Sequence, residues 1–321
     1  MVLFDMEGVS GVTNVKQTQF AYSKEYAEGR KSLTADVNAA VAGLKSAGAA
    51  EIVIVDGHGS GNFTEPDVLE AELTPPAKMI DPAAPFDIYM GSYDHSFDAI
   101  VAIGMHAGAG NRVGFLSHTY AYEDVDYRVN GTPVNESMIL AMGAARLKIP
   151  LIMVSGDDQL EKEVRRSLPW VRFATVKHAV ARSKVEPLPR TEVDHRIESA
   201  AREALSALAS AMLPEFPGPY RFALTFQDAA QAANAGLLPG AEVQGQTVQI
   251  RANDFEEGYL KSLRLIRLAG AVGFSSAAAA VVRSHEPGVA ISDWLTDRWL
   301  TGLIPGAAVP ETSKRKYWGA P

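Results

Sequence analysis

The sequence predicts an α/β protein whose central sheet is mostly parallel and flanked by helices, followed by a smaller C-terminal α+β domain. The first observation behind this prediction is that apolar runs of strand length recur along the chain, with helical patterns between them. Such an alternation is typical of a parallel sheet covered by helices. The second observation is the length of 321 residues, which exceeds what one hydrophobic core usually organises.

The elements of the larger domain can be placed in chain order from apolar runs, helical periodicity and turn residues. Asn-Gly between two strand-like segments predicts a tight hairpin. The expected elements are a strand at 2–4, a helix at 27–47, a strand at 51–55, a short helical region after residue 80, a strand at 99–103, a hairpin turned at Asn130-Gly131, a helix from about Asn135, a strand at 149–154 and a helix at 159–169.

A Pro-rich stretch around Glu186 to Arg190 predicts a domain boundary. We expect a domain at 1–186, a second at 187–283 and an extension at 284–321. The second domain should contain a helix at 192–212, a strand at 220–226, a helix at 228–236, a strand at 241–250 and a helix at 254–270. In the extension, one face of an amphipathic helix would carry Trp294, Leu295, Trp299, Leu303 and Ile304, and would contact either its own domain or another subunit.

Composition and charge exclude several classes of function. A net charge of -8 argues against nucleic acid or an anionic membrane as a partner, because both favour a basic surface. The absence of cysteine excludes disulfides, thiolate metal sites and a cysteine nucleophile, so any metal must bind His, Asp or Glu. The chain lacks an apolar run of membrane-spanning length and a signal-like N-terminus, which predicts a cytoplasmic protein. Because the first strand begins almost at Met1, the possibility of a longer natural N-terminus stays open.

Polar side chains follow each apolar run, at the strand ends where ligands bind in an open parallel sheet. Asp5 and Glu7 follow the first run and, in an extended segment, point to the same side. The later strand ends carry Asp56 and His58, then His106, then Asp157 and Asp158. Both histidines lie on glycine-rich turns.

Each of these residues has a plainer explanation when it is taken alone. Acidic residues near turns are common, a turn histidine is usually hydrogen-bonded, and Glu136 at a helix start interacts well with the helix dipole. These explanations must nevertheless account for Asp5, Glu7, His58 and His106 at one edge of the sheet. Together with Glu136 they form a nitrogen and oxygen ligand set that suits zinc or manganese, with enough ligands for two ions sharing a carboxylate.

His118, in FLSHTY, lies shortly after His106 in a predicted loop or short strand. An imidazole there would reach the metal site without being a ligand. It would transfer a proton or stabilise the oxyanion of a tetrahedral intermediate. The alternative is a hydrogen-bonded loop histidine.

The opening stretch VLFDMEG resembles the nucleophile motif of haloacid dehalogenase phosphatases, an apolar run followed by D-x-D-G. The resemblance implies a magnesium-dependent phosphatase with Asp5 as nucleophile, and SGDD at 155–158 as the later acidic motif. Glu7, however, stands where that superfamily most often has Asp. The resemblance also gives no role to His58, His106 or Glu136.

A second resemblance covers more of the chain. The motifs FDMEGVSG, VDGHGS, IGMHA, LSHTY, VNGTPVNE and VSGDD, in this order, resemble the zinc-dependent D-aminopeptidase family, and the similarity extends to about Arg283. Several motifs in fixed order are far more specific than one. The resemblance implies a binuclear zinc peptidase, with Mn²⁺ or Co²⁺ as substitutes, metal ligands Asp5, Glu7, His58, His106 and Glu136, and His118 as the catalytic side chain. Asp5 would bridge the two ions.

The family also implies a homodecamer whose central channel admits short peptides. The expected reaction is removal of one N-terminal residue from a short peptide or aminoacyl amide, with a D-residue as the family substrate. This sequence departs from the family at Asn135, where Gly often precedes the last ligand, and after about Arg283. The first departure bears on the preference for D-residues, and the second on assembly.

Overall fold

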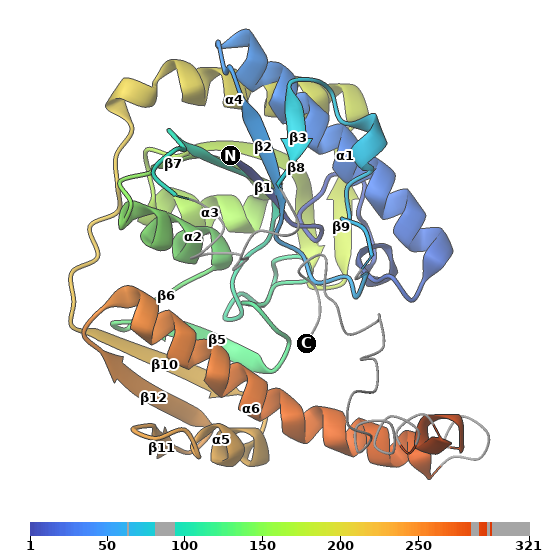
Figure 1. Ribbon diagram of the computed structural model, residues 1–321, viewed down its shortest axis with the longest axis vertical. Helices are drawn as coiled ribbons and strands as arrows, with labels where there is room; N and C mark the ends of the chain where they lie inside the picture. The colour runs from blue at the N-terminus through green and yellow to red at the C-terminus, as the bar shows by residue number, and fades with distance from the viewer. Residues whose placement is uncertain (63, 81–93, 284–288, 294–295, 297–321) are drawn as a thin grey trace, which may run out of the picture.

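Two β-sheets organise the protein, and helices cover both of them (Figure 1). In the computed structural model, residues 1–62, 64–80, 94–283, 289–293 and 296 are described. The first sheet is parallel except for one edge strand, and the second is antiparallel. The predicted α/β class is therefore confirmed.

The first sheet has seven strands in the order β3-β2-β1-β4-β7-β8-β9. Only β9, which pairs with β8, is antiparallel to its neighbour. The strands are β1 (Val2–Phe4), β2 (Ile52–Asp56), β3 (Ala77–Met79), β4 (Ile100–Met105), β7 (Leu151–Asp157), β8 (Arg172–Ala181) and β9 (Lys184–Pro187).

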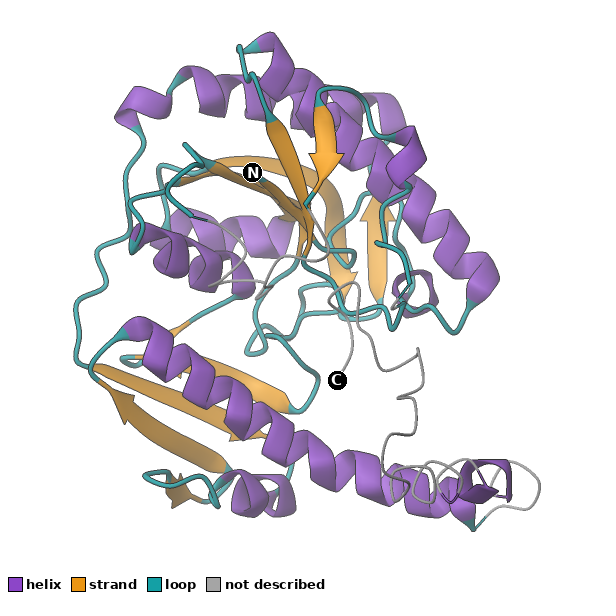
Figure 2. Cartoon of the chain, viewed as in Figure 1, coloured by secondary structure: helices purple, strands orange, loops and turns teal. Residues whose placement is uncertain are grey.

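Helices lie on both faces of this sheet, with α1 and α4 on one face and α2 and α3 on the other (Figure 2). Alternate residues of β1 point to opposite faces, so Val2 and Phe4 join the core beneath α1 and α4, and Leu3 joins the core beneath α2 and α3. The helices are α1 (Ser23–Ser46), α2 (Glu136–Ala145), α3 (Asp158–Ser167) and α4 (Arg190–Ser206). Short 3₁₀ turns lie at Val15–Thr18, Glu70–Glu72 and Leu208–Ser210.

The second sheet has five strands in the order β11-β12-β10-β5-β6 and packs against α5 and α6. Its apolar side chains belong to the same core as α2, so a continuous apolar layer joins the two sheets. Its elements are β5 (Asp124–Val129), β6 (Thr132–Pro133), β10 (Tyr220–Phe226), α5 (Ala229–Ala235), β11 (Glu242–Gln244), β12 (Thr247–Ala252) and α6 (Phe255–Val282).

Most expected elements are present, and the differences have local causes. The predicted hairpin is confirmed, since β5 and β6 meet at Asn130 (φ 50°) and Gly131 (φ 82°), the left-handed pair that a tight hairpin requires. The single strand expected at 241–250 is instead a hairpin, because Gly245 (φ 61°) turns the chain between β11 and β12. Strands β8 and β9 were not predicted.

The predicted domain boundary at 186/187 stays a prediction. The second sheet takes β5 and β6 from before that boundary, and α4 from after it covers the first sheet. The short helical region expected after residue 80 and the apolar face expected in the extension at 284–321 lie outside the described residues. Among the helices that the structure describes, none is long and apolar enough to cross a membrane.

The interior position of β1, between β2 and β4, brings the predicted strand ends together. β1 lies between β2 and β4, so the loop that follows it is flanked by the loops that follow both neighbours. The backbone fixes this arrangement, because Asp5 N–H donates to the Ile103 carbonyl at 2.8 Å and Gly8 N–H donates to the Gly104 carbonyl at 2.7 Å. The loop after β1 therefore lies directly against the end of β4.

We predict that Gly8→Ala disrupts this contact. A Cβ at Gly8 would lie 1.8 Å from the Met105 carbonyl oxygen, so the loop after β1 has to move away from β4. The control is Gly131→Ala, where a Cβ meets nothing within 4 Å and only the left-handed backbone opposes it. Thermal or urea unfolding should show a loss of about 1–2 kcal/mol for the control and a larger loss for Gly8→Ala. Equal losses would contradict the proposed close packing.

Candidate metal centre

The structure brings together all six residues that the sequence singled out as ligands or catalytic group. Asp5 and Glu7 follow β1, His58 follows β2, and His106 follows β4. Glu136 is the first residue of α2, whose N-cap Asn135 accepts a hydrogen bond from Met138 N–H. His118 comes from the loop between β4 and β5. Five segments of the chain thus converge at the carboxyl edge of the first sheet.

Asp5, Glu7 and His58 form one group whose ligand atoms lie within 4.8 Å of one another. His58 Nε2 is 3.4 Å from Glu7 Oε1. The other oxygen of Glu7, Oε2, is buried and makes no hydrogen bond to the described part of the chain. A buried carboxylate oxygen without a donor is costly unless a cation faces it.

His106, His118 and Glu136 form a second group within the same 4.8 Å limit. His106 Nε2 lies 3.5 Å from Glu136 Oε1 and 3.2 Å from Asp5 Oδ2, so Asp5 connects the two groups. His106 Nε2 is also buried and makes no hydrogen bond to the described residues. The other ring nitrogen, Nδ1, lies 3.0 Å from the Ala107 carbonyl, which holds a proton on Nδ1 and leaves Nε2 as the nitrogen that a metal ion would bind.

These donor atoms fit divalent metal ions. The set consists of carboxylates and imidazoles without thiolates, which suits zinc and similar ions. All six side chains are at most 8% exposed, so they are screened little by water. Within this set of six side chains, Glu7 Oε2 and His106 Nε2 are buried atoms that make no hydrogen bond to the described residues, and a bound cation would give both a partner.

The pKa values of the buried carboxylates and imidazoles also indicate that the cluster would be stabilised by positive charge. Burial raises the pKa of Asp5 to about 7, with the charge of Glu7 acting in the same direction. Burial would lower the pKa values of His58 and His106, but the neighbouring carboxylates outweigh it and raise both well above the usual value. The carboxylates thus hold protons on the two imidazoles, and a metal ion has to displace those protons.

His118 is a neutral imidazole in these surroundings. Burial and the charge of His106 lower the pKa of His118 to about 4. Its ring stacks on that of His106, with centroids 4.0 Å apart, and Nδ1 lies 2.7 Å from the Leu116 carbonyl. If Nδ1 carries the proton and donates it to the Leu116 carbonyl, Nε2 has a free lone pair that can accept a proton. His118 could therefore act either as a metal ligand or as a proton acceptor.

The chain matches known aminopeptidases over most of its length. The family model described as D-aminopeptidase, peptidase family M55, matches residues 1–263. The chain belongs to the D-aminopeptidase family. It is therefore a peptide hydrolase of the aminopeptidase type.

Two comparisons with a Bacillus subtilis protein agree with this membership. The D-aminopeptidase of strain 168 is 29% identical over 273 residues, which cover 84% of this chain and 97% of that protein. A solved structure described as the Zn-dependent D-aminopeptidase DppA from Bacillus subtilis, a self-compartmentalizing protease, superposes with a TM-score of 0.75 at 28% identity. That match covers 84% of this chain and 98% of the other.

The phosphatase alternative has no support in the structure of this family member. Asp157, which the alternative placed in an acidic magnesium motif, has both carboxylate oxygens occupied by backbone donors. Oδ1 caps α3 by accepting from Gln159 and Leu160 N–H, and Oδ2 accepts from Phe115 N–H at 2.8 Å. Asp157 thus organises loops and lies in neither metal-binding group.

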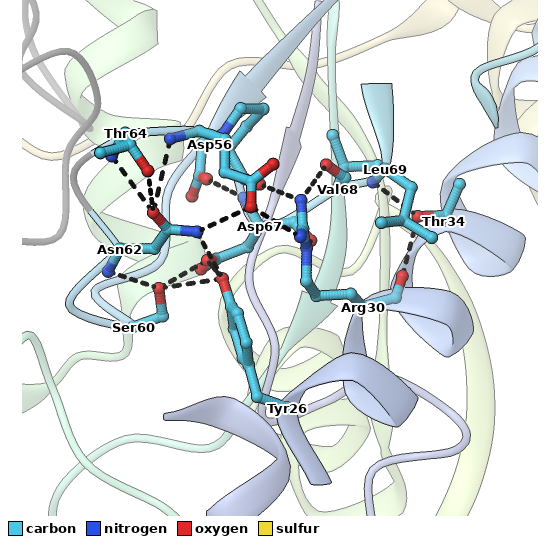
Figure 3. Close-up of polar contacts among 12 residues, drawn as sticks. Tyr26, Arg30, Thr34, Asp56, Ser60, Asn62, Thr64, Asp67, Val68 and Leu69 are labelled. Atoms are coloured by element: carbon cyan, nitrogen blue, oxygen red, sulfur yellow. Dashed lines mark hydrogen bonds and ion pairs between the residues drawn. The ribbon is translucent and has the colours of Figure 1, made fainter. Parts of the chain in front are cut away.

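Sequence reasoning missed Asp67, which lies at the centre of the hydrogen-bond network in Figure 3 and contacts His58. Asp67 Oδ2 is 2.7 Å from His58 Nδ1, and the hydroxyl groups of Tyr26 and Ser60 both bond to Asp67 Oδ1. Arg30 of α1 donates to the backbone carbonyl of Asp67 at 2.9 Å. A carboxylate that fixes one ring nitrogen of a histidine orients the other nitrogen toward a metal.

Asp56, at the end of β2, holds the same loop. Its Oδ1 accepts from His58 N–H at 3.0 Å, and its Oδ2 accepts from Asp67 N–H at 2.7 Å. The strand-end position of Asp56 was noted in the sequence, but the structure places it behind His58. It orders the loop and does not join either metal-binding group.

Sequence reasoning also missed Tyr122. Its ring lies 4.6 Å from the His118 ring, and its hydroxyl lies 3.4 Å from Glu7 Oε1. The side chain is nevertheless 48% exposed. Tyr122 therefore reaches from solvent to the cluster and forms part of its rim.

We predict that Asp67→Asn weakens metal binding without unfolding the protein. An amide presents an N–H₂ group either to His58 Nδ1 or to the hydroxyl donors of Tyr26 and Ser60, so one of these contacts is lost. Loss of such a supporting carboxylate typically costs roughly 10–100-fold in metal affinity. Chelator competition measures the zinc Kd. The control is Glu65→Gln, an exposed carboxylate in the same loop that bonds to Arg30. An unchanged Kd for Asp67→Asn would contradict the assigned role.

Proposed function

We propose that the protein is a binuclear zinc aminopeptidase that removes one N-terminal residue, a D-residue by family membership, from short peptides. The observation that carries this proposal is the pair of adjoining ligand groups connected by Asp5. Asp5, Glu7 and His58 would hold one ion, and Asp5, His106 and Glu136 the other. Mn²⁺ and Co²⁺ prefer similar nitrogen and oxygen ligands and would substitute.

Bound zinc ions supply a Lewis acid that acidifies water and polarises the scissile carbonyl group. Side chains and backbone carbonyl groups of the protein orient the residues that would bind these ions. His106 and His58 are fixed by contacts of their Nδ1 atoms, to the Ala107 carbonyl and to Asp67, so that both Nε2 atoms face the cluster. Such preset orientations reduce the reorganisation needed at the moment of reaction.

His118 would transfer the proton that hydrolysis requires. Its neutral ring lies against His106 and accepts a proton at Nε2 while the Leu116 carbonyl holds Nδ1. Transfer to the amine of the leaving peptide would complete bond cleavage. The phenol of Tyr122 at the rim would lie beside the substrate and limit the access of water from that side.

The proposed assembly and substrate size rest on the likeness to a relative. The Bacillus subtilis DppA structure is described as a self-compartmentalizing protease, which supports a homo-oligomer that admits short peptides. We retain the decamer and a cytoplasmic location as proposals. The negative charge of -8 favours neither nucleic acid nor anionic membranes as partners.

Metal removal and a substrate panel test the proposed function. Chelation should abolish hydrolysis of aminoacyl amides, since the ions supply the activated water, and added zinc should restore it. Across matched D- and L-aminoacyl amides, the D-isomers should be cleaved faster. Magnesium-dependent release of phosphate from a generic phosphoester, with no amide hydrolysis, would instead support the phosphatase. Bound zinc without hydrolysis of any member of the panel would support a binding protein.

We predict that His118→Ala keeps its zinc and loses most turnover. Removal of a proton-transfer group lowers kcat by roughly 10²–10⁴-fold. Measuring both the zinc content and the kcat of the purified variant distinguishes a proton-transfer group from a metal ligand. His106→Ala is the matched comparison, because loss of that stacked neighbour should release zinc. Loss of zinc from His118→Ala as well would make His118 a ligand.

A further inference from the structure

A buried lysine lies directly beneath the loop that carries the first two proposed ligands. Lys177 belongs to β8, and its side chain is 0% exposed. Its ammonium group donates to three backbone carbonyl oxygens, those of Glu7 at 2.6 Å, Val12 at 2.7 Å and Val9 at 2.8 Å. An ammonium has three donors, so each of them is used on this one loop.

The same ammonium group also contacts the loop that carries His118. The Phe115 ring lies with its centroid 4.6 Å from Lys177 Nζ, a distance at which a cation is attracted to the ring face. Phe115 is itself buried, and its N–H donates to Asp157 at the end of β7. Lys177 thus connects β8 with two separate loops of the metal centre.

A second buried charge holds the loop after β1 from its other side. Asp36 of α1 is 0% exposed and accepts both Ser10 N–H at 2.9 Å and Ser10 Oγ–H at 2.8 Å. Arg190 of α4 pairs with the same carboxylate. Lys177 binds the carbonyl oxygens of the loop, and Asp36 binds an N–H and a hydroxyl group. Residues 7–12 therefore have little freedom to move.

The burial of the Lys177 ammonium group indicates that it holds the loop after β1 in place. A buried ammonium is expensive unless hydrogen bonds compensate it. Three carbonyl oxygens of the loop after β1 supply that compensation for Lys177. What an apolar side chain cannot do is satisfy three carbonyl groups and hold the loop in one conformation.

We propose that Lys177 is a positioning residue of the metal centre, whose ammonium group fixes the backbone of residues 7–12 so that Asp5 and Glu7 meet their metal ions. This inference rests on the proposed zinc centre. It assigns Lys177 no contact with substrate. Its effect passes through the Glu7 backbone, so the ion held by Glu7 and His58 should respond more than the ion held by His106 and Glu136.

Zinc titration of two variants tests the proposal. Lys177→Met keeps the volume of the side chain but removes all three donors, and Lys177→Gln keeps two N–H donors without charge. The control is Ser262→Ala, which removes a buried hydroxyl bonded to Tyr127 in the second sheet, far from the loop in sequence and fold. Zinc Kd values come from chelator competition, and the visible spectrum of Co²⁺-loaded protein reports ligand geometry.

We expect Lys177→Met to weaken the more sensitive zinc ion by roughly 10–100-fold, as loss of a supporting group typically does. Lys177→Gln should lie between this variant and the wild type, and it carries the test alone if Lys177→Met does not fold. The Co²⁺ spectrum should change in both variants but not in Ser262→Ala. Zinc Kd values and spectra that match those of Ser262→Ala would overturn the proposal. A wild-type chain without zinc affinity would instead overturn the proposed function on which it rests.

Discussion

The constraint on which the rest of the structure depends is the burial of three carboxylates, two after strand β1 and one at the start of helix α2. Asp5, Glu7 and Glu136 are each at most 4% exposed. Carboxylates in such surroundings need cations within a few ångströms. The imidazoles of His58 and His106 meet part of this need, at 3.4 Å from Glu7 and 3.2 Å from Asp5. Glu7 Oε2 and His106 Nε2 still make no hydrogen bond to the described residues, and these are atoms that metal ions would bind.

Much of the surrounding structure keeps these side chains in place. Asp67 orients His58 from behind, and Lys177 and Asp36 hold the loop after β1 from opposite sides. Gly8 lets that loop approach the end of β4, where a larger residue would collide with a carbonyl group. The supporting residues come from β8, α1 and the loop after β2. The metal centre therefore depends on the packing of the whole first sheet and not on its ligands alone.

The sequence could predict the ligands because they occupy regular positions. Parallel strands end at one edge, so Asp5, His58 and His106 could be brought together from the strand pattern alone, and Glu136 from the helix start after Asn130-Gly131. Asp67 could not be found this way, because it lies in an irregular loop with no periodicity. Lys177 was missed together with β8, although a lysine within the mostly apolar stretch VRFATVKHAV is a signal that could have been used. Its acceptors lie about 170 positions away in the chain, and only the fold shows that contact.

The most direct test of the central claim is a crystal structure of the zinc-loaded protein with anomalous data collected at the zinc edge. We expect two zinc peaks, one within each of the two ligand groups, with an Asp5 oxygen next to both. A single peak would contradict the binuclear centre. Two peaks with Asp5 bound to only one of them would contradict the bridging role, and zinc peaks outside both groups would contradict the site itself.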